Sequence, residues 1–571
     1  MIFLLLLVSG AVFAALFRTW RVEDLLSSVS GIPTGEESAV CFYARADLLP
    51  SGDVIKLFED GKQVGELRDD GTSPDETEGD GIFSGMAILR CETEKIVTFH
   101  ASYRLRRSKP LSFVYYDPLT DEQIDRYEEH LAAFDAIESP YCGEDGLIAQ
   151  EDVPLLLDEL EQYARDHLSL DDIQEVKRGE TDLMVTFSGG IPFVYEPYTE
   201  AGVLSAEAPV QGPTMIPTTP EEESETRFYE NGFGLAPSED APSGRIVVAE
   251  PFSSTIQQWI VSGLDYIIAG NKLYEDSSDW HAEAVARNVA KAASFYTLEE
   301  ADIMIDREVQ ATRLRYLGSF GLLIWDGHGG YKDEHGPTLA LYADTTKGEL
   351  LTHMADFRLN LMTSCKASGV KCFQAFPEFF ARYLSYSPGA IVFLSSCHGL
   401  QDDRLSNVFF AKGASVVIGF DNVVSSFYAL QFEKTFFELL TAPLDGRAPT
   451  VREAFDRTVQ ICGPSDSING THPVLRAMNG GENKTLLMLE QQTEATTRSP
   501  RHVPSPHGLS EWIDGLKQKV ADDAKNQQEA LRQTVSEWIA NGISRLFDAV
   551  GNLFLNALLA LLRMIEKLLT G

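Results

Sequence analysis

The chain has 571 residues, of which 44% are hydrophobic and 10% aromatic, so it can fill several cores and is expected to form two to four domains. Its 47 basic and 86 acidic residues give a formal charge of −39 at pH 7. Nucleic acids and anionic membranes attract basic patches, so this charge argues against either as a partner. A solvated acidic surface, a saline habitat or divalent-cation binding would each account for it.

Residues 1–17 are uncharged and almost entirely apolar. Val12, Phe13 and Ala14 offer a small-residue cleavage site, which favours a secretory signal peptide. An uncleaved signal anchor is the alternative, because the run is only slightly shorter than the ~20 residues of a spanning helix. Both readings predict an exported protein, either secreted or held at the cell surface or in the periplasm.

Residues 37–117 are typical of an all-β domain. Strand-like runs separated by turns occupy 39–43, 54–58, 96–103 and 111–116. This pattern predicts a small immunoglobulin-like sandwich.

A loop of this β domain concentrates four aspartates, which are Asp69, Asp70, Asp75 and Asp80. They offer the oxygen ligands of a structural Ca²⁺ ion, although the ligand order of an EF-hand is absent. The other reading, which we favour, is Asp-Gly turn chemistry.

Residues 118–205 form a predicted α-rich connecting segment, with helices starting near Asp121 and Val153 and one strand at 183–187. Residues 206–244 are rich in Pro, Gly, Thr and acidic side chains, and they predict a linker. Arg227 within this acidic linker is a candidate site for activating cleavage.

Residues 245–490 alternate apolar strand signals with helical patterns. Strands are predicted at 245–251, 320–325, 388–394 and 415–419, and helices at 280–293, 427–440 and 451–459. Unbroken apolar runs suit parallel strands that are covered on both faces. The predicted fold is therefore α/β, with a doubly wound, mainly parallel sheet.

Two of these strands each lead into a reactive side chain. Residues 320–325 are followed by Asp-Gly-His-Gly-Gly, which contains His328, and residues 388–394 by Ser-Ser-Cys-His-Gly, which contains Cys397. If the strands are neighbours, both side chains emerge at the carboxyl edge of the sheet, where open α/β sheets bind ligands. A thiol with an imidazole nearby is a nucleophile with its proton shuttle. A buried structural cysteine and a loop histidine are the plain alternative, but the matched strand contexts favour the dyad.

This arrangement resembles the caspase-related cysteine peptidases, and within that clan it is most similar to the gingipain-like branch. The resemblance extends over roughly residues 245–489, including Phe409–Phe420 and Thr450–Phe455 after the cysteine. The sequence departs from caspases proper in its Ser-Ser-Cys-His-Gly motif and in the separation of 69 positions between His328 and Cys397.

The resemblance implies a secreted cysteine endopeptidase that acts on protein or peptide substrates and requires no cofactor for its chemistry. It implies that the backbone amides of Gly329 and Cys397 form the oxyanion hole, and that the loop with Asp421 lines the pocket for the residue before the cleaved bond. An ionised Asp421 there would favour Arg or Lys, whereas its other reading is a turn cap. The rival function is an exported binding protein that keeps a peptidase-like scaffold without turnover.

Seven cysteines fit an exported protein, and their odd number leaves one thiol, which we assign to Cys397. Proximity in sequence favours the pairs Cys41–Cys91 and Cys365–Cys372. A zinc site at Cys365 and Cys372 is not expected, because the spacing lacks a two-by-two ligand pattern.

Residues 491–508 form a second predicted linker, rich in Thr, Arg, Pro and Ser. Residues 509–571 predict an amphipathic helical tail with one apolar face. This tail is expected to pack on the body of the protein or on another subunit, with a membrane interface as the alternative.

Overall fold

The computed structural model describes residues 21–486, except for 48, 50–51, 76–77, 80, 105, 144–147, 180–181, 198–242, 253–281, 344–346, 368–369, 445–446 and 468. The chain divides into two compact units, and every described residue belongs to the first, which comprises 1–258 and 279–501. The predicted signal segment, the second linker, the C-terminal tail and nearly all of the acidic linker lie outside the described residues. None of the helices that the structure describes is both long and apolar enough to cross a membrane.

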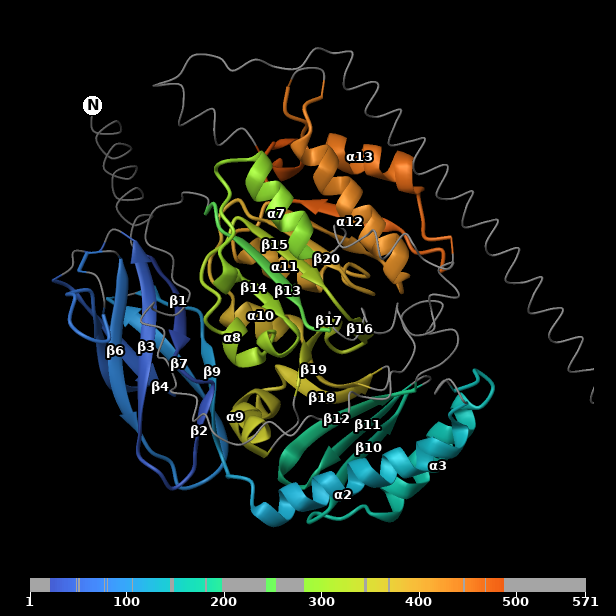
Figure 1. The fold of residues 1–571 in the computed structure, drawn as a ribbon. Coiled ribbons are helices and arrows are strands. Elements are labelled where there is room, and N and C mark those ends of the chain that lie inside the picture. The colour runs from blue at the N-terminus through green and yellow to red at the C-terminus, as the bar shows by residue number, and fades with distance from the viewer. Residues whose placement is uncertain are drawn as a thin grey trace, which may run out of the picture. The chain divides into compact units, whose positions relative to one another are not determined.

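The chain is a mixed α/β protein, and its first part is a nine-stranded sheet (Figure 1). Its strands are β1 (Arg21–Ser27), β2 (Gly31–Pro33), β3 (Ser38–Asp47), β4 (Val54–Glu59), β5 (Lys62–Arg68), β6 (Ile82–Leu89), β7 (Lys95–Tyr103), β8 (Arg106–Arg107) and β9 (Leu111–Tyr116). All four predicted strands are present. The strands form one hydrogen-bonded sheet in the order β1-β3-β6-β5-β4-β7-β9-β2, with β8 on β7. Because strands at both ends of this order contribute to a single core, the sheet curls around its own apolar side chains.

The second sheet joins two distant parts of the chain. Its order is β10 (Ile173–Arg178), β11 (Leu183–Phe187), β12 (Ile191–Glu196), β18 (Met362–Ala367), β19 (Val370–Ala375), β17 (Gly336–Tyr342) and β16 (Gly329–Lys332). The parallel pairing of β12 with β18 links the two parts. Residues 173–196 are therefore not a mere connection: they share a sheet with the segment inserted between His328 and Cys397.

Helices α2 (Asp121–Glu138) and α3 (Val153–Asp166) precede this second sheet and bury their apolar faces in its core. Thr120 starts α2 with a capping box, in which its side chain accepts the Gln123 amide while the Gln123 side chain accepts the Thr120 amide. This reciprocal pairing satisfies backbone donors that a helix start otherwise leaves open.

The third sheet carries the predicted α/β topology. Its order is β14 (Ile303–Ile305), β13 (Ile246–Glu250), β15 (Leu322–Asp326), β20 (Ile391–Ser395), β21 (Val416–Phe420) and β22 (Pro473–Ala477). The first five strands are parallel, and β22 is antiparallel at one edge. The prediction of a mainly parallel sheet is thus confirmed.

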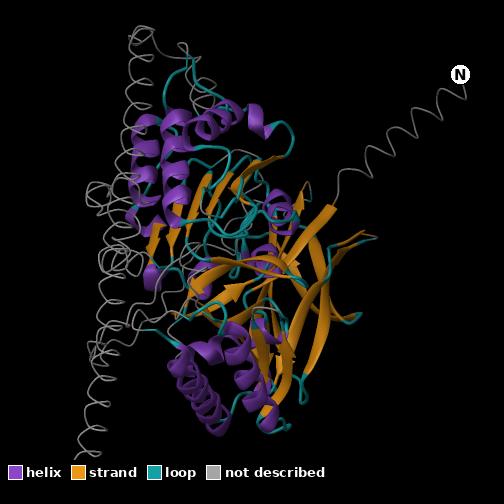
Figure 2. Cartoon of the chain, turned by 90° about the vertical axis from the view of Figure 1, so that its right-hand side faces the viewer, coloured by secondary structure: helices purple, strands orange, loops and turns teal. Residues whose placement is uncertain are grey.

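Alternate side chains of the third sheet enter two different cores, which explains the unbroken apolar runs. Ile324 and Phe393 face one core, with helices α7 (Ala282–Ala292), α12 (Ser426–Thr441) and α13 (Val451–Cys462). Trp325 and Leu394 face the other, with α10 (Pro377–Tyr383) and α11 (Arg404–Ala411). Figure 2 shows some helices along the outer side of the strands and others lying among the strands. Among the described residues, the other α-helices are α8 (Ala311–Leu314) and α9 (Lys347–Arg358).

The buried carboxylate of Asp356 on helix α9 is hydrogen-bonded to a residue beside the first sheet. Asp356 is 0% exposed and forms a salt bridge with Arg315. Its other oxygen accepts hydrogen bonds at 2.6 Å from the hydroxyls of Tyr383 and of Ser30, which lies just before β2. Burial alone would raise the pKa of Asp356, but the charge of Arg315 outweighs it and holds that pKa well below its usual range.

Of the two predicted disulfides, one is confirmed and the other is wrong. Cys365 and Cys372 are bonded, with 5.2 Å between their Cα atoms, because they lie directly opposite each other in the β18–β19 hairpin. The predicted Cys41–Cys91 bond is wrong: both residues are thiols. Cys41 lies opposite Met86, five residues before Cys91, and five strand residues span roughly 17 Å, whereas disulfide Cα atoms lie within about 7 Å. Cys142, Cys397 and Cys462 are thiols as well.

Candidate functional site

The two strands that lead to His328 and Cys397 are neighbours. β15 and β20 pair in parallel, with Asp326 opposite Ser395. His328 and Cys397 each follow one of these residues by two positions, so both leave the sheet at the same carboxyl edge. The adjacency on which the predicted dyad depends is confirmed.

The backbones at these two positions touch. A Cβ atom on Gly329 would lie 2.2 Å from the carbonyl oxygen of Cys397, a distance that real Cβ atoms do not reach, so only glycine fits here. The amide of Gly327 donates to the carbonyl of Ser395 at 3.1 Å, so the segments after β15 and β20 stay in backbone contact beyond the paired strands. Gly329 and Cys397, the two residues whose amides the family resemblance assigns to an oxyanion hole, are therefore in direct backbone contact.

His328 is half-buried and lies at the start of a hairpin. Its carbonyl accepts the Ala340 amide at 3.0 Å, just before β16 pairs with β17. Its ring lies 4.9 Å from the ring of Phe252, measured between centroids. Phe252 follows β13, so the segment after β13 lies against this imidazole, while β17 binds the His328 backbone.

The thiol of Cys397 is held by one backbone unit. The Val424 amide donates to the sulfur at 3.4 Å, and the thiol lies 3.6 Å from the Val424 carbonyl, which accepts from it. Val424 is buried and lies between β21 and α12. An amide aimed at sulfur stabilises the thiolate, which is the nucleophilic form.

The turn after Cys397 has a strained backbone. His398 has φ = 57°, a left-handed conformation that costs non-glycine residues about 1–3 kcal/mol and clusters at functional sites. Its amide donates to the Asn422 carbonyl at 3.0 Å, and its Nδ1 lies 2.7 Å from Gln401 Oε1. Burial lowers the pKa of His398, although the Gln401 hydrogen bond and the charge of Glu196 oppose this. His398 is thus neutral at pH 7 and supplies no positive charge to the thiol.

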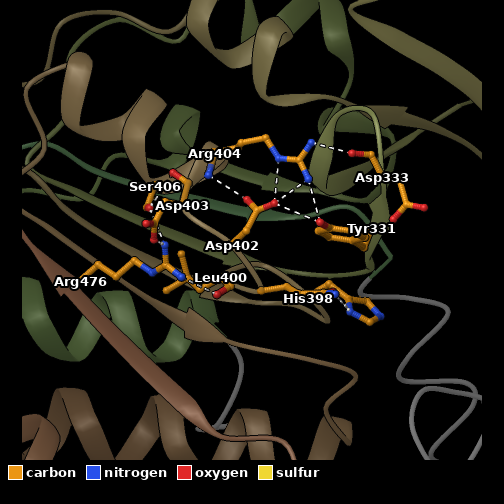
Figure 3. Close-up of polar contacts among 10 residues, drawn as sticks. Tyr331, Asp333, His398, Leu400, Asp402, Asp403, Arg404, Ser406 and Arg476 are labelled. Carbon is orange, nitrogen blue, oxygen red and sulfur yellow. Dashed lines mark hydrogen bonds and ion pairs between the residues drawn. The ribbon is translucent and has the colours of Figure 1, made fainter.

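Two arginines hold this turn in place. Figure 3 shows Arg404 reaching from α11 across Asp402 to Tyr331 on β16. Its guanidinium donates to the Asp402 carboxylate at 2.7 Å, to the Tyr331 hydroxyl at 2.8 Å and to the Asp333 carbonyl at 2.9 Å. Arg476 on β22 donates to the Leu400 carbonyl at 2.9 Å. Arg404 therefore connects the hairpin that begins at His328 to the turn that follows Cys397.

Asp421 lies directly after β21, beside the Val424 segment, and its side chain is 38% exposed. One carboxylate oxygen accepts the His472 amide at 2.8 Å, and the other lies 3.4 Å from His472 Nδ1. The carboxylate thus joins the residue after β21 to His472, the residue before β22, rather than capping a local turn, and it adjoins the candidate site.

Beneath the candidate site lie three carboxylates that the sequence did not single out. Glu250 and Asp326 end the adjacent strands β13 and β15, and Glu433 reaches them from α12. Glu433 is 0% exposed. Burial raises its pKa well above the usual value, and the charges of Asp326 and Glu250 raise it further. Burial therefore favours the protonated form of Glu433.

The aspartate loop of the first sheet is organised by its own backbone. Asp69 accepts the Gly79 and Gly81 amides at 2.5 and 3.0 Å, Asp75 accepts the Gly71 amide at 2.6 Å, and Asp70 accepts the Thr72 amide at 3.0 Å. These contacts are the turn chemistry that we favoured. Asp80, the fourth predicted ligand, lies outside the described residues. In the part of the chain that the structure describes, no three His, Cys, Asp or Glu side chains are arranged to hold a metal ion.

No known family model matches the chain, and no curated protein matches it either. No relative therefore supplies a function for this site, and its chemistry rests on its own geometry. The residues that sequence reasoning missed, Val424, Arg404 and Glu433, act through backbone atoms or through contacts distant in sequence, and no motif identifies such contacts.

Proposed function

We propose that the protein is a cysteine endopeptidase in which Cys397 is the nucleophile and His328 the acid and base. The observation that carries this proposal is the parallel pairing of β15 and β20, with Asp326 opposite Ser395, two residues before each proposed catalytic side chain. The Val424 amide at the sulfur adds a reason for the thiol to ionise.

In this mechanism the Cys397 thiolate attacks the scissile carbonyl and forms a C–S bond. The carbonyl oxygen becomes an oxyanion, which the amides of Gly329 and Cys397 receive; one such donor is worth about 3 to 4 kcal/mol. Protonated His328 then gives its proton to the leaving amine. His328 next takes a proton from water, which hydrolyses the thioester and restores the thiol.

The proposal also includes the type of each domain, the export of the protein and its partners. The five parallel strands with one antiparallel edge are consistent with a caspase- or gingipain-type catalytic domain, and the curled nine-stranded sheet with an immunoglobulin-like module. The apolar segment at 1–17 supports export. Protein or peptide substrates, and contacts of the 509–571 tail with a membrane or another subunit, follow from the sequence patterns.

The test is labelling with a peptide that carries a thiol-reactive ketone, followed by mass spectrometry of each cysteine. We expect label on Cys397, none on Cys397→Ala, and much slower labelling on His328→Ala. Peptide hydrolysis should disappear in Cys397→Ala while the circular dichroism spectrum stays unchanged.

Cys91→Ala is the matched control, because Cys91 is a thiol in the connection between β6 and β7, and its replacement should have no effect. Turnover by Cys397→Ala near the parental rate would end the proposal. A protein that takes the label but hydrolyses no peptide in a broad library would favour the binding-protein alternative.

A further inference from the structure

The loop between α13 and β22, residues 463–472, lies against the segment that holds the Cys397 sulfur. Asp466 in this loop is 1% exposed, and one oxygen of its carboxylate accepts the Ser425 amide at 2.8 Å. Ser425 directly follows Val424, the residue whose amide donates to the sulfur. The buried carboxylate is therefore one residue away from the thiol contact.

The same loop also binds the residue that precedes Val424. The Thr471 hydroxyl donates to the Val423 carbonyl, and Thr471 is buried. Its own carbonyl accepts the Asp466 amide at 2.8 Å, which closes the loop on itself. Two side chains of this loop, Asp466 and Thr471, thus bind the backbone on either side of Val424.

Asp466 also receives a hydrogen bond from the Asn469 side-chain amide at 3.0 Å. A buried carboxylate needs such donors, because an ion without them pays a large desolvation cost. Its partners place it at a fixed position between the loop and the start of α12, where Ser425 is the N-cap residue.

We propose that Asp466 is a positioning residue for the nucleophile: by holding the Ser425 amide, it fixes the Val424 backbone so that the amide of Val424 points at the Cys397 sulfur. When the thiol ionises, it loses the hydrogen bond that it donates to the Val424 carbonyl. The hydrogen bond from the Val424 amide to the sulfur then becomes charge-assisted and stronger. Removing Asp466 frees this segment, so the thiolate loses a donor and forms only at higher pH. The inference rests on the proposed function for its catalytic meaning, but its primary measurement concerns the thiol alone.

The experiment follows the alkylation of Cys397 by iodoacetamide between pH 5 and 10 in the full chain, with peptide-resolved mass spectrometry. In Asp466→Ala we expect the midpoint of the profile to move up by about one unit and the rate at pH 7 to fall by roughly tenfold, as that shift implies. Asp466→Asn keeps one acceptor oxygen of the same size, so it should fall between parent and alanine variant. If the peptidase proposal holds, kcat should fall with little change in KM.

Thr450→Ala is the control for lost stability. It removes the N-cap of α13, a change that costs about 1 kcal/mol, without touching residues 423–425. Its Cys397 profile should match the parent. Cys462 will not obscure the result, since burial raises the pKa of its thiol to about 12.

An unchanged Cys397 profile in both Asp466 variants, or an equal change in Thr450→Ala, would overturn the positioning role. These outcomes are distinct from failure of the proposed function, which shows as persistent turnover in Cys397→Ala. If Asp466→Ala does not fold, Asp466→Asn alone decides, because it must still shift the profile.

Discussion

Glu433 is a carboxylic acid where a hydrophobic side chain would be expected. Its raised pKa means that the folded state takes up a proton that the unfolded chain releases above its ordinary value of about 4.3. The contribution of Glu433 to the free energy of unfolding is therefore complete below about pH 4.3. It is lost as the pH rises toward the pKa of the folded state, at about 1.4 kcal/mol per pH unit.

We predict that Glu433→Gln, a neutral side chain of the same shape, raises the free energy of unfolding at pH 8, with a smaller gain at pH 5. Urea unfolding at several pH values measures this. Glu438→Gln is the control, because Glu438 lies on the same helix but is 30% exposed and paired with Lys434. A difference between Glu433→Gln and parent that stays constant from pH 5 to 8 would contradict the prediction.

Asp421 gives a second prediction at this scale. If it attracts Arg or Lys to the proposed substrate pocket, Asp421→Ala should lower kcat/KM for basic peptides and leave apolar peptides unaffected. If it only joins the ends of β21 and β22 through the His472 amide, all peptides should lose activity equally. A peptide library with the cleaved position varied separates the two results.

At the scale of elements, Arg404 joins the hairpin after His328 to the turn after Cys397. We predict that Arg404→Ala lowers kcat by about tenfold, since small displacements of catalytic groups cost up to roughly 100-fold. Tyr331→Phe, which removes only the hydroxyl, should have a smaller effect.

Arg452→Ala is the matched control, because Arg452 forms an exposed pair with Asp456 on α13. Steady-state kinetics with a peptide substrate measures all three variants. Equal losses in Arg404→Ala and Arg452→Ala would show that Arg404 contributes charge or stability rather than alignment.

Four of the six strands of the third sheet, β13, β15, β20 and β21, were predictable, because strands buried on both faces leave unbroken apolar runs such as 388–394, whereas the edge strands β14 and β22 were not predicted. Of the second sheet, the sequence predicted only β11, at 183–187. β16 (Gly-Gly-Tyr-Lys) and β18 (Met-Thr-Ser-Cys-Lys-Ala) have no such run, and the pairing of β12 with β18 joins residues about 170 positions apart. Likewise the His328 and Cys397 motifs were visible in sequence, whereas the Val424 amide that contacts the sulfur is a backbone atom with no residue signature.

At the scale of the whole molecule, the buried Asp356–Arg315 pair makes the nine-stranded sheet part of a larger folding unit. We predict that Asp356→Ala lowers the free energy of unfolding by about 3 to 5 kcal/mol, because it leaves the Arg315 charge buried without its partner. Ser30→Ala removes one hydroxyl from the same carboxylate and should cost about 1 kcal/mol. Urea unfolding followed by tryptophan fluorescence compares them, and a loss below about 1 kcal/mol in Asp356→Ala would show that the pair contributes little.

The shared second sheet also decides what proteolytic processing can do. β10, β11 and β12 precede Arg227, while β16 to β19 follow it, and β12 is hydrogen-bonded to β18. The disulfide that the described residues contain lies wholly within the later part. A cut at Arg227 would thus leave a nicked heterodimer, held without a covalent link, instead of releasing an activation peptide. Denaturing gels should show two bands with or without reductant, while gel filtration gives the elution volume of the uncut protein. An N-terminal fragment that elutes separately from the rest would refute this.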